Sequence, residues 1–122
     1  MDFICAQTEE IMNFITDTYG DKPEFLFEDS DTAVFRKGER KKWYAVIMNI
    51  SARKLGIESD ERVQVLNVKL SPSEIALIVD RVAYFPAYHM NKKHWCTILL
   101  NGTLETDEIC YRMGQSYSLV KG

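Results

Sequence analysis

The strongest functional feature of this sequence is two clusters rich in basic residues. Both contain side chains that can bind an anion, and both lie beside predicted strands. The first cluster is Arg36, Lys37, Arg40, Lys41 and Lys42, and the second is Tyr88, His89, Asn91, Lys92, Lys93 and His94. Lysine and arginine neutralise phosphates, whereas amides and aromatic rings supply hydrogen bonds and base stacking. If the clusters meet at one end of a sheet, they form a cationic ridge, and we expect DNA as the partner.

The same two clusters have a simpler interpretation as solvated turns. Charges at hairpin turns are common, and they keep sheet edges from pairing with other chains. The net charge of the 122-residue chain is −3, and its pI is near 5.4, which excludes a surface that is basic throughout. A nucleic-acid site must therefore be local. A protein-binding or small-anion-binding domain with no nucleic-acid role stays the alternative.

Metal binding and catalysis are less well supported by the residue pattern. His89 and His94 have no Cys/His partner pair elsewhere that would complete a tetrahedral zinc site. Cys96 shares a predicted strand face with His94, but no third orienting group or oxyanion hole accompanies them. We therefore expect no metal, no cofactor, no catalytic residue and no enzymatic activity.

The composition predicts one domain over residues 1–122. A hydrophobic content of 46% in 122 residues is enough for one continuous core. The first residues lack a basic region followed by an apolar run, and no later run approaches the roughly 20 apolar residues that span a bilayer. Cys5, Cys96 and Cys110 are odd in number and widely separated, which argues against a disulfide framework. We therefore expect a cytoplasmic monomer without membrane contact.

Hydrophobic periodicity predicts the elements that position these residues. Apolar residues recur at helical spacing within residues 4–20 and 109–117, and Ser71-Pro72-Ser73-Glu74 is a typical helix start. The predicted elements are a helix within 4–20, strands at 24–27, 32–36, 42–50 and 62–70, a helix at 71–81, a loop at 82–93, a strand at 94–100 and a closing helix. The order α-β-β-β-β-α-β-α lacks the regular alternation of a parallel doubly wound sheet. It predicts an α+β fold, with an antiparallel sheet of about five strands and helices packed on one face.

Several polar and aromatic residues inside the predicted strands allow two interpretations. Asn49 and Asn67 interrupt apolar strands, where amides usually need partners, so they mark either a solvent-facing binding surface or strand ends. Trp43 and Trp95 are either core or sheet-surface aromatics, which bury large areas, or platforms on which bases stack.

Three stretches of the chain resemble the bacterial MmcQ/YjbR family. They are Val34-Phe35-Arg36 followed by Lys42-Trp43-Tyr44-Ala45-Val46-Ile47, then Val65-Leu66-Asn67-Val68-Lys69, and Pro86-Ala87-Tyr88-His89-Met90-Asn91-Lys92-Lys93-His94-Trp95. Lys22-Pro23 and Ser116-Tyr117-Ser118-Leu119-Val120 extend the match over nearly the whole chain. Many relatives carry a glycine before the Pro-Ala-Tyr-His-Met stretch, where this chain has Arg81-Val82-Ala83-Tyr84-Phe85. The resemblance implies a CyaY-like, frataxin-type fold and a probable DNA-binding role. The frataxin-type fold also implies one further alternative, weak iron binding through oxygen ligands, for which the acidic candidates are Asp17, Asp21, Glu24, Glu28, Asp29 and Asp31. These acids lie largely in turns, where acidic residues are common, so we do not expect an iron site.

Overall fold

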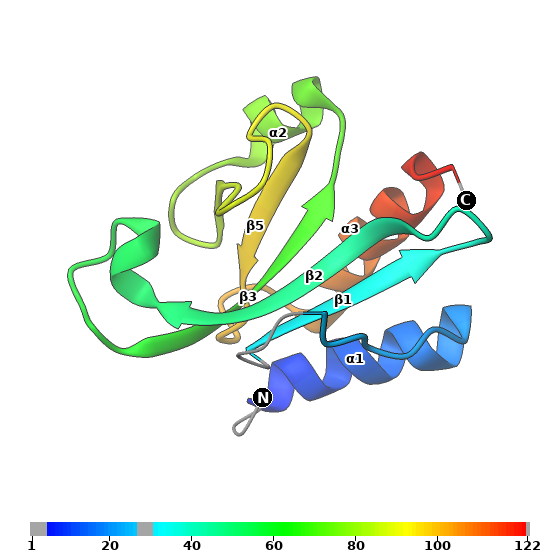
Figure 1. The fold of residues 1–122 in the computed structure, drawn as a ribbon. Helices are drawn as coiled ribbons and strands as arrows, with labels where there is room; N and C mark the ends of the chain where they lie inside the picture. Colours follow the sequence, from blue (N-terminus) through cyan, green and yellow to red (C-terminus); the bar gives the residue numbers. More distant parts are fainter. Residues whose placement is uncertain (1–4, 27–30, 122) are drawn as a thin grey trace.

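The computed structural model describes residues 5–26 and 31–121 (Figure 1). Phe27, Glu28 and Asp29, which belong to the predicted first hairpin and to the acidic candidates, lie outside the described residues. The elements are α1 (Ala6–Tyr19), β1 (Thr32–Lys37), β2 (Lys42–Ser51), the 3-10 helix η1 (Ala52–Leu55), β3 (Arg62–Lys69), α2 (Pro72–Ile78), β4 (Tyr84–Pro86), β5 (Trp95–Leu99) and α3 (Thr106–Leu119).

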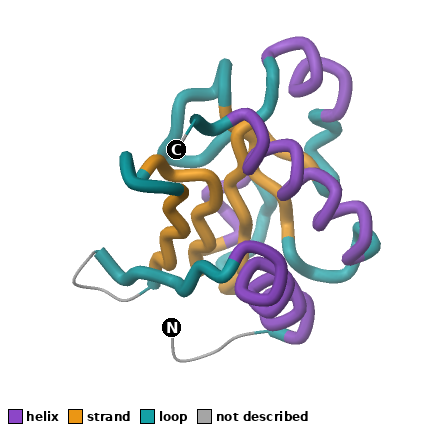
Figure 2. Tube along the Cα trace, turned by 90° about the vertical axis from the view of Figure 1, so that its right-hand side faces the viewer, coloured by secondary structure: helices purple, strands orange, loops and turns teal. Residues whose placement is uncertain are grey.

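The strands form one five-stranded sheet in the order β1-β2-β3-β5-β4. Every neighbouring pair is antiparallel. The helices α1 and α3 lie side by side over one face of this sheet (Figure 2). The predicted α+β fold, with an antiparallel five-stranded sheet and helices on one face, is therefore confirmed.

The predicted strand at residues 24–27 is wrong over its described part. Glu24 forms one isolated antiparallel bridge with Val34, through two backbone hydrogen bonds of 2.9 Å each. The apolar side chains that follow, Phe25 and Leu26, are 48% and 46% exposed. The segment is aromatic and β-favouring, but a strand also needs a packed sheet face beneath its side chains.

The sequence pattern predicted a loop at residues 82–93, but this segment contains the edge strand β4. Pro86 ends this strand, and β4 is an edge strand, the position where a sheet tolerates proline. The start of α2 is as predicted, because Ser71 Oγ accepts a hydrogen bond of 3.3 Å from Glu74 N. The helix ends at Ile78, short of the predicted residue 81. Arg81 then turns the chain with a φ of 59°, a left-handed conformation that suits glycine better.

The sheet has a different cover on each face. The main core lies between the sheet and the helices, and its fully buried members include Ile11, Phe35, Ile47 and Ile109. We call the opposite side the outer face. Its central row crosses all five strands through paired residues, which are Val34, Val46, Asn67, Thr97 and Phe85. The cluster on this face also takes in Leu55 of η1 and the half-buried Tyr88, so η1 and the chain after β4 help to cover it.

Candidate nucleic-acid interface

Two indole rings and a lysine lie one row beyond the buried centre of the outer face. Lys69 pairs with Trp95 across β3 and β5. Because side chains of a strand alternate between faces, Lys69 and Trp95 share the face of Asn67 and Thr97. Trp43 of β2 is half-buried and packs against the outer-face cluster. The three side chains therefore stand on one face, each on a different strand.

These side chains contribute to a groove at the end of the sheet where the β1–β2 turn, the loop after β4 and the C-terminal residues meet. The groove has a volume of about 460 Å³. It is lined by Arg40, Lys42, Trp43, Lys69, Met90, Trp95, Leu119, Val120 and Lys121. Among these lining residues four are cations and none carries a carboxylate, although the chain as a whole has more acidic than basic residues. We call it the cationic groove.

A β-bulge and a buried serine hold the backbone beneath the groove. Phe35 pairs with Ala45 and Arg36 with Trp43, so Tyr44 is an extra residue on β2. Ser116 of α3 is fully buried. Its Oγ donates to Tyr44 O at 2.6 Å and accepts from Lys69 N at 2.8 Å. One side chain of α3 thus bridges the backbones of β2 and β3, next to Trp43 and at Lys69.

The structure divides the first predicted basic cluster. Arg40 and Lys42 line the cationic groove. Arg36 makes hydrogen bonds of 2.8 Å and 2.6 Å to the Glu24 carboxylate, and this contact holds the pKa of Glu24 below its usual range. Lys37 Nζ donates to the backbone oxygen of Tyr117 at 2.7 Å and lies 4.1 Å from the centroid of its ring. Arg36 and Lys37 therefore have structural partners, and Lys41 is exposed in the turn with a φ of 55°.

Buried hydrogen bonds attach the loop of the second cluster to the outer face. Asn67 Nδ2 donates to Tyr88 O at 2.9 Å, and Tyr88 N donates to Thr97 Oγ1 at 2.9 Å. The Thr97 hydroxyl in turn donates to Asn67 Oδ1. Asn67 and Thr97 are fully buried, so Asn67 marks neither a solvent-facing surface nor a strand end. The pair instead fixes the position from which the chain continues to Met90.

The cations of the second cluster lie outside the lining of the cationic groove. Lys92 lines a second hollow of about 250 Å³, to which Tyr88, Lys54 and Arg81 also contribute. Asn91 Oδ1 accepts from the backbone N–H groups of Lys93 at 2.8 Å and His94 at 3.3 Å, so this amide shapes the turn. The side chains of Lys93, His94 and His89 are exposed, and His89 has a φ of 60°. Met90 is the residue of this loop that reaches the cationic groove.

Lys69 and Lys121 are the groove cations that sequence reasoning missed. Both come from segments far from the two basic clusters, so a search for runs of charge passes over them. One signal was available for Lys69, because period-two alternation places it on the same face of its strand as Asn67. For Lys121 the sequence carries no comparable signal.

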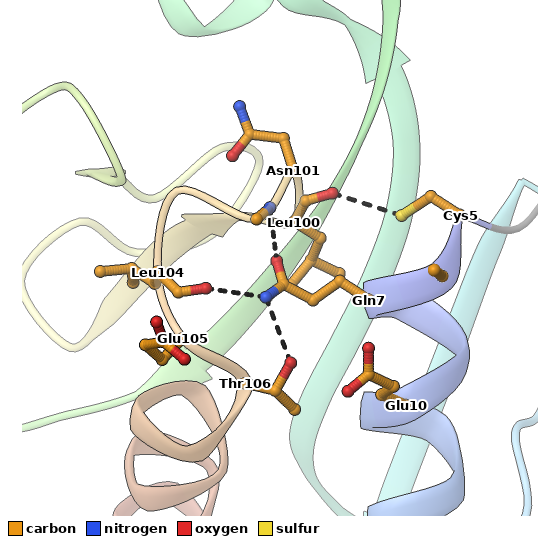
Figure 3. A pocket seen from close by; sticks show the side chains of 10 residues that line it. Cys5, Gln7, Glu10, Leu100, Asn101, Leu104, Glu105 and Thr106 are labelled. Atoms are coloured by element: carbon orange, nitrogen blue, oxygen red, sulfur yellow. Dashed lines mark hydrogen bonds between the residues drawn. The ribbon is translucent and has the colours of Figure 1, made fainter.

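A third hollow lies where α1 begins, and the side chain of Gln7 there is fully hydrogen-bonded within the fold (Figure 3). Gln7 is 8% exposed, and its amide nitrogen donates to Leu104 O at 2.8 Å and to Thr106 Oγ1 at 3.3 Å. Its amide oxygen accepts from Gly102 N at 3.0 Å. Cys5 Sγ donates to Leu100 O at 3.3 Å. These contacts fasten the loop between β5 and α3 to the first turn of α1.

Metal and thiol chemistry find little support in the described residues. Within 5–26 and 31–121, no group of three or more His, Cys, Asp or Glu side chains could hold a metal ion. Cys96 is fully buried on the core side, and burial raises the pKa of its thiol to about 11. All three cysteines are free thiols. Across the same part of the chain, no helix is long and apolar enough to cross a membrane.

Comparison with known proteins identifies the family. A family model described as YjbR matches residues 16–119. The uncharacterized protein YyaQ of Bacillus subtilis (strain 168) is 33% identical over 114 residues, which cover 93% of this chain and 97% of YyaQ. A crystal structure of a Pseudomonas syringae protein is 38% identical, with a TM-score of 0.89 and coverage of 93% of this chain and 97% of that chain. A Deinococcus radiodurans crystal structure is 25% identical, with a TM-score of 0.71 and coverage of 92% and 76%. The chain therefore belongs to the YjbR family.

Proposed function

We propose that this protein is a nucleic-acid-binding module that holds phosphates in the cationic groove and catalyses no reaction. The observation that carries the proposal is the composition of the groove lining, in which four cations surround two tryptophans without a carboxylate. In a chain of net charge −3 this is a local reversal of charge. A local patch of one sign attracts a polyanion without making the whole surface basic.

The electrostatic part of this proposal has a magnitude that can be measured. Each phosphate contact releases counterions, so the logarithm of the binding constant falls linearly with the logarithm of salt concentration. Four contacts give a slope of about −2.8 with a single strand and about −3.6 with B-form DNA. Raising the salt from about 50 to about 200 mM then weakens binding by about 50-fold for the single strand and about 150-fold for the duplex.

A charge-matched pair of variants tests the site. The groove variant is Arg40→Gln, Lys42→Gln and Lys121→Gln, and the control is Lys22→Gln, Arg53→Gln and Arg62→Gln. All six side chains are exposed, and each variant removes three positive charges. Fluorescence anisotropy of labelled DNA, titrated at several salt concentrations, gives the slope for each protein. We expect the groove variant to lose about 2 to 3 units of slope and the control to keep the wild-type slope.

Three results of this titration contradict the proposal. The first is the absence of wild-type binding to any oligonucleotide at micromolar protein and low salt. The second is a groove variant that keeps the wild-type slope, and the third is a control variant that loses as much slope as the groove variant. A double variant, Lys92→Gln with Lys93→Gln, shows separately whether the second basic cluster adds contacts.

The volume of the groove favours one alternative, a domain that binds a small anion. About 460 Å³ lies within the roughly 300 to 1,000 Å³ that is typical of small-ligand pockets. A free nucleotide or pyrophosphate would then bind as tightly as an oligonucleotide. Competition of each compound against the labelled DNA separates the two functions, because a polyanion site loses most of its affinity when only one or two phosphates remain.

A further inference from the structure

We infer that the cationic groove takes up an unpaired nucleobase on its tryptophans, so that the protein prefers single strands to duplexes. This inference rests on the proposed function and goes beyond it. Single strands and duplexes both offer phosphates to the cations of the groove. Stacking on an aromatic ring, by contrast, requires a base whose face is free, and only an unpaired base has one.

The arrangement of the rings and charges carries the inference. Trp43 and Trp95 are half-buried and both line the groove. Trp43 also packs against the outer-face cluster. Lys69 lies on the same sheet face, directly opposite Trp95. Single-strand binding sites combine aromatic platforms for bases with cations along the backbone path. The groove has both elements, with Arg40, Lys42 and Lys121 completing the cationic side.

The remaining walls of the groove also suit a flat apolar body better than a phosphate. Met90 and Leu119 supply two apolar side chains, whereas Val120, which also lines the groove, is 3% exposed and packs in the main core. A phosphate gains nothing from these walls, since a charged group loses hydration beside apolar atoms. A base gains contact area there. In a duplex each base is stacked on its neighbours and exposes only its edge, so it must first be flipped out of the stack, which opposes binding.

The tryptophans themselves provide the assay. The chain has two tryptophans and both line the groove, so tryptophan fluorescence, excited at wavelengths that tyrosine does not absorb, reports on this site alone. We would titrate the protein with single-stranded DNA, single-stranded RNA and duplex DNA of about 12 units, at one salt concentration. We expect quenching by the single strands and an affinity at least about fivefold higher than for the duplex, the lower end of the range for stacking one base.

Variants at Trp95 separate stacking from charge. Trp95→Leu removes the ring and keeps an apolar side chain, whereas Trp95→Phe keeps a ring. Anisotropy of a labelled oligonucleotide replaces fluorescence as the readout, and circular dichroism confirms folding. Trp95→Leu should lower single-strand affinity at least about fivefold and leave duplex affinity unchanged, while Trp95→Phe should retain most of the wild-type single-strand affinity.

The outcomes distinguish failure of this inference from failure of the proposed function. Equal affinity for single strand and duplex, with no effect of Trp95→Leu, overturns stacking and leaves the phosphate site standing. A mononucleotide that binds as tightly as the oligonucleotide also overturns the preference for strands. No binding of any nucleic acid at low salt overturns both.

Discussion

Removing the Thr97 hydroxyl should destabilise the protein strongly, although the change is small in volume. Thr97 is fully buried, accepts from Tyr88 N at 2.9 Å and donates to Asn67 Oδ1. Thr97→Val keeps the shape of the side chain but leaves a backbone N–H and an amide oxygen unpaired. Each unsatisfied buried group costs about 1 to 3 kcal/mol. Because Tyr88 is only half-buried and water can reach part of it, we expect a total of about 3 kcal/mol.

Equilibrium unfolding in urea measures this change. For a chain of 122 residues, a loss of about 3 kcal/mol corresponds to a fall in Tm of about 12 °C. Thr18→Val, at an exposed position of α1, is the matched control and should stay within about 0.5 kcal/mol of the wild type. Loss of the loop anchor should also weaken binding in the cationic groove, because Met90 follows Tyr88 by two residues.

A double-mutant cycle shows whether the hydrogen bonds are the cause. Asn67→Leu alone leaves the Thr97 hydroxyl and the Tyr88 carbonyl oxygen without their partners. Combining Asn67→Leu with Thr97→Val removes both polar side chains, so the double variant should be more stable than the sum of the single effects predicts, by about 1 to 2 kcal/mol. Single variants that cost less than about 0.5 kcal/mol, or effects that simply add, would refute this account.

Three further predictions concern other parts of the fold. The Asp80 carboxylate accepts hydrogen bonds from the backbone N–H groups of Val82, Ala83 and Tyr84, and these bonds lower the pKa of Asp80. The carboxylate therefore stabilises the fold above the pKa of an unfolded aspartate, near 3.9. This stabilisation is lost as the pH falls through the lowered pKa of the folded state. Urea unfolding below about pH 4 should therefore show a steeper loss of stability for the wild type than for Asp80→Asn. Ser116→Ala leaves Tyr44 O and Lys69 N unpaired and should cost about 2 to 4 kcal/mol in urea unfolding. Burial raises the pKa of the Cys96 thiol to about 11, so mass spectrometry after iodoacetamide treatment near pH 8 should find it unmodified until urea is added.

The elements that follow from local sequence were predictable, and those that depend on distant partners were not. Ser71 and Pro72 indicate the start of α2 through capping chemistry that acts within a few residues. By contrast, the three residues of β4 are a strand only because β5 pairs with them. The segment at Glu24 differs in the opposite way. Its composition favours a strand, but it pairs with β1 through one isolated bridge only.

The same distinction applies to the candidate site. Arg40 and Lys42 were found because they lie close together in sequence, and both line the groove. Arg36 was named for the same reason, but it is ion-paired with Glu24, a partner that only the fold brings near. Lys69 and Lys121 were missed because they reach the groove from β3 and from the end of the chain. Charge runs identify solvated turns, whereas a binding groove is assembled from separate elements.

The most direct test of nucleic-acid binding in the cationic groove is an NMR titration of isotope-labelled protein with a single-stranded oligonucleotide. Trp43 and Trp95 each give one indole N–H signal, and both belong to the groove. We expect both indole signals and the backbone amide of Lys121 to shift progressively, while the amides of Gln7 and Thr106, in the hollow of Figure 3, stay in place. Shifts centred on Gln7 and Thr106, or unchanged indole signals at an excess of oligonucleotide, would contradict the account.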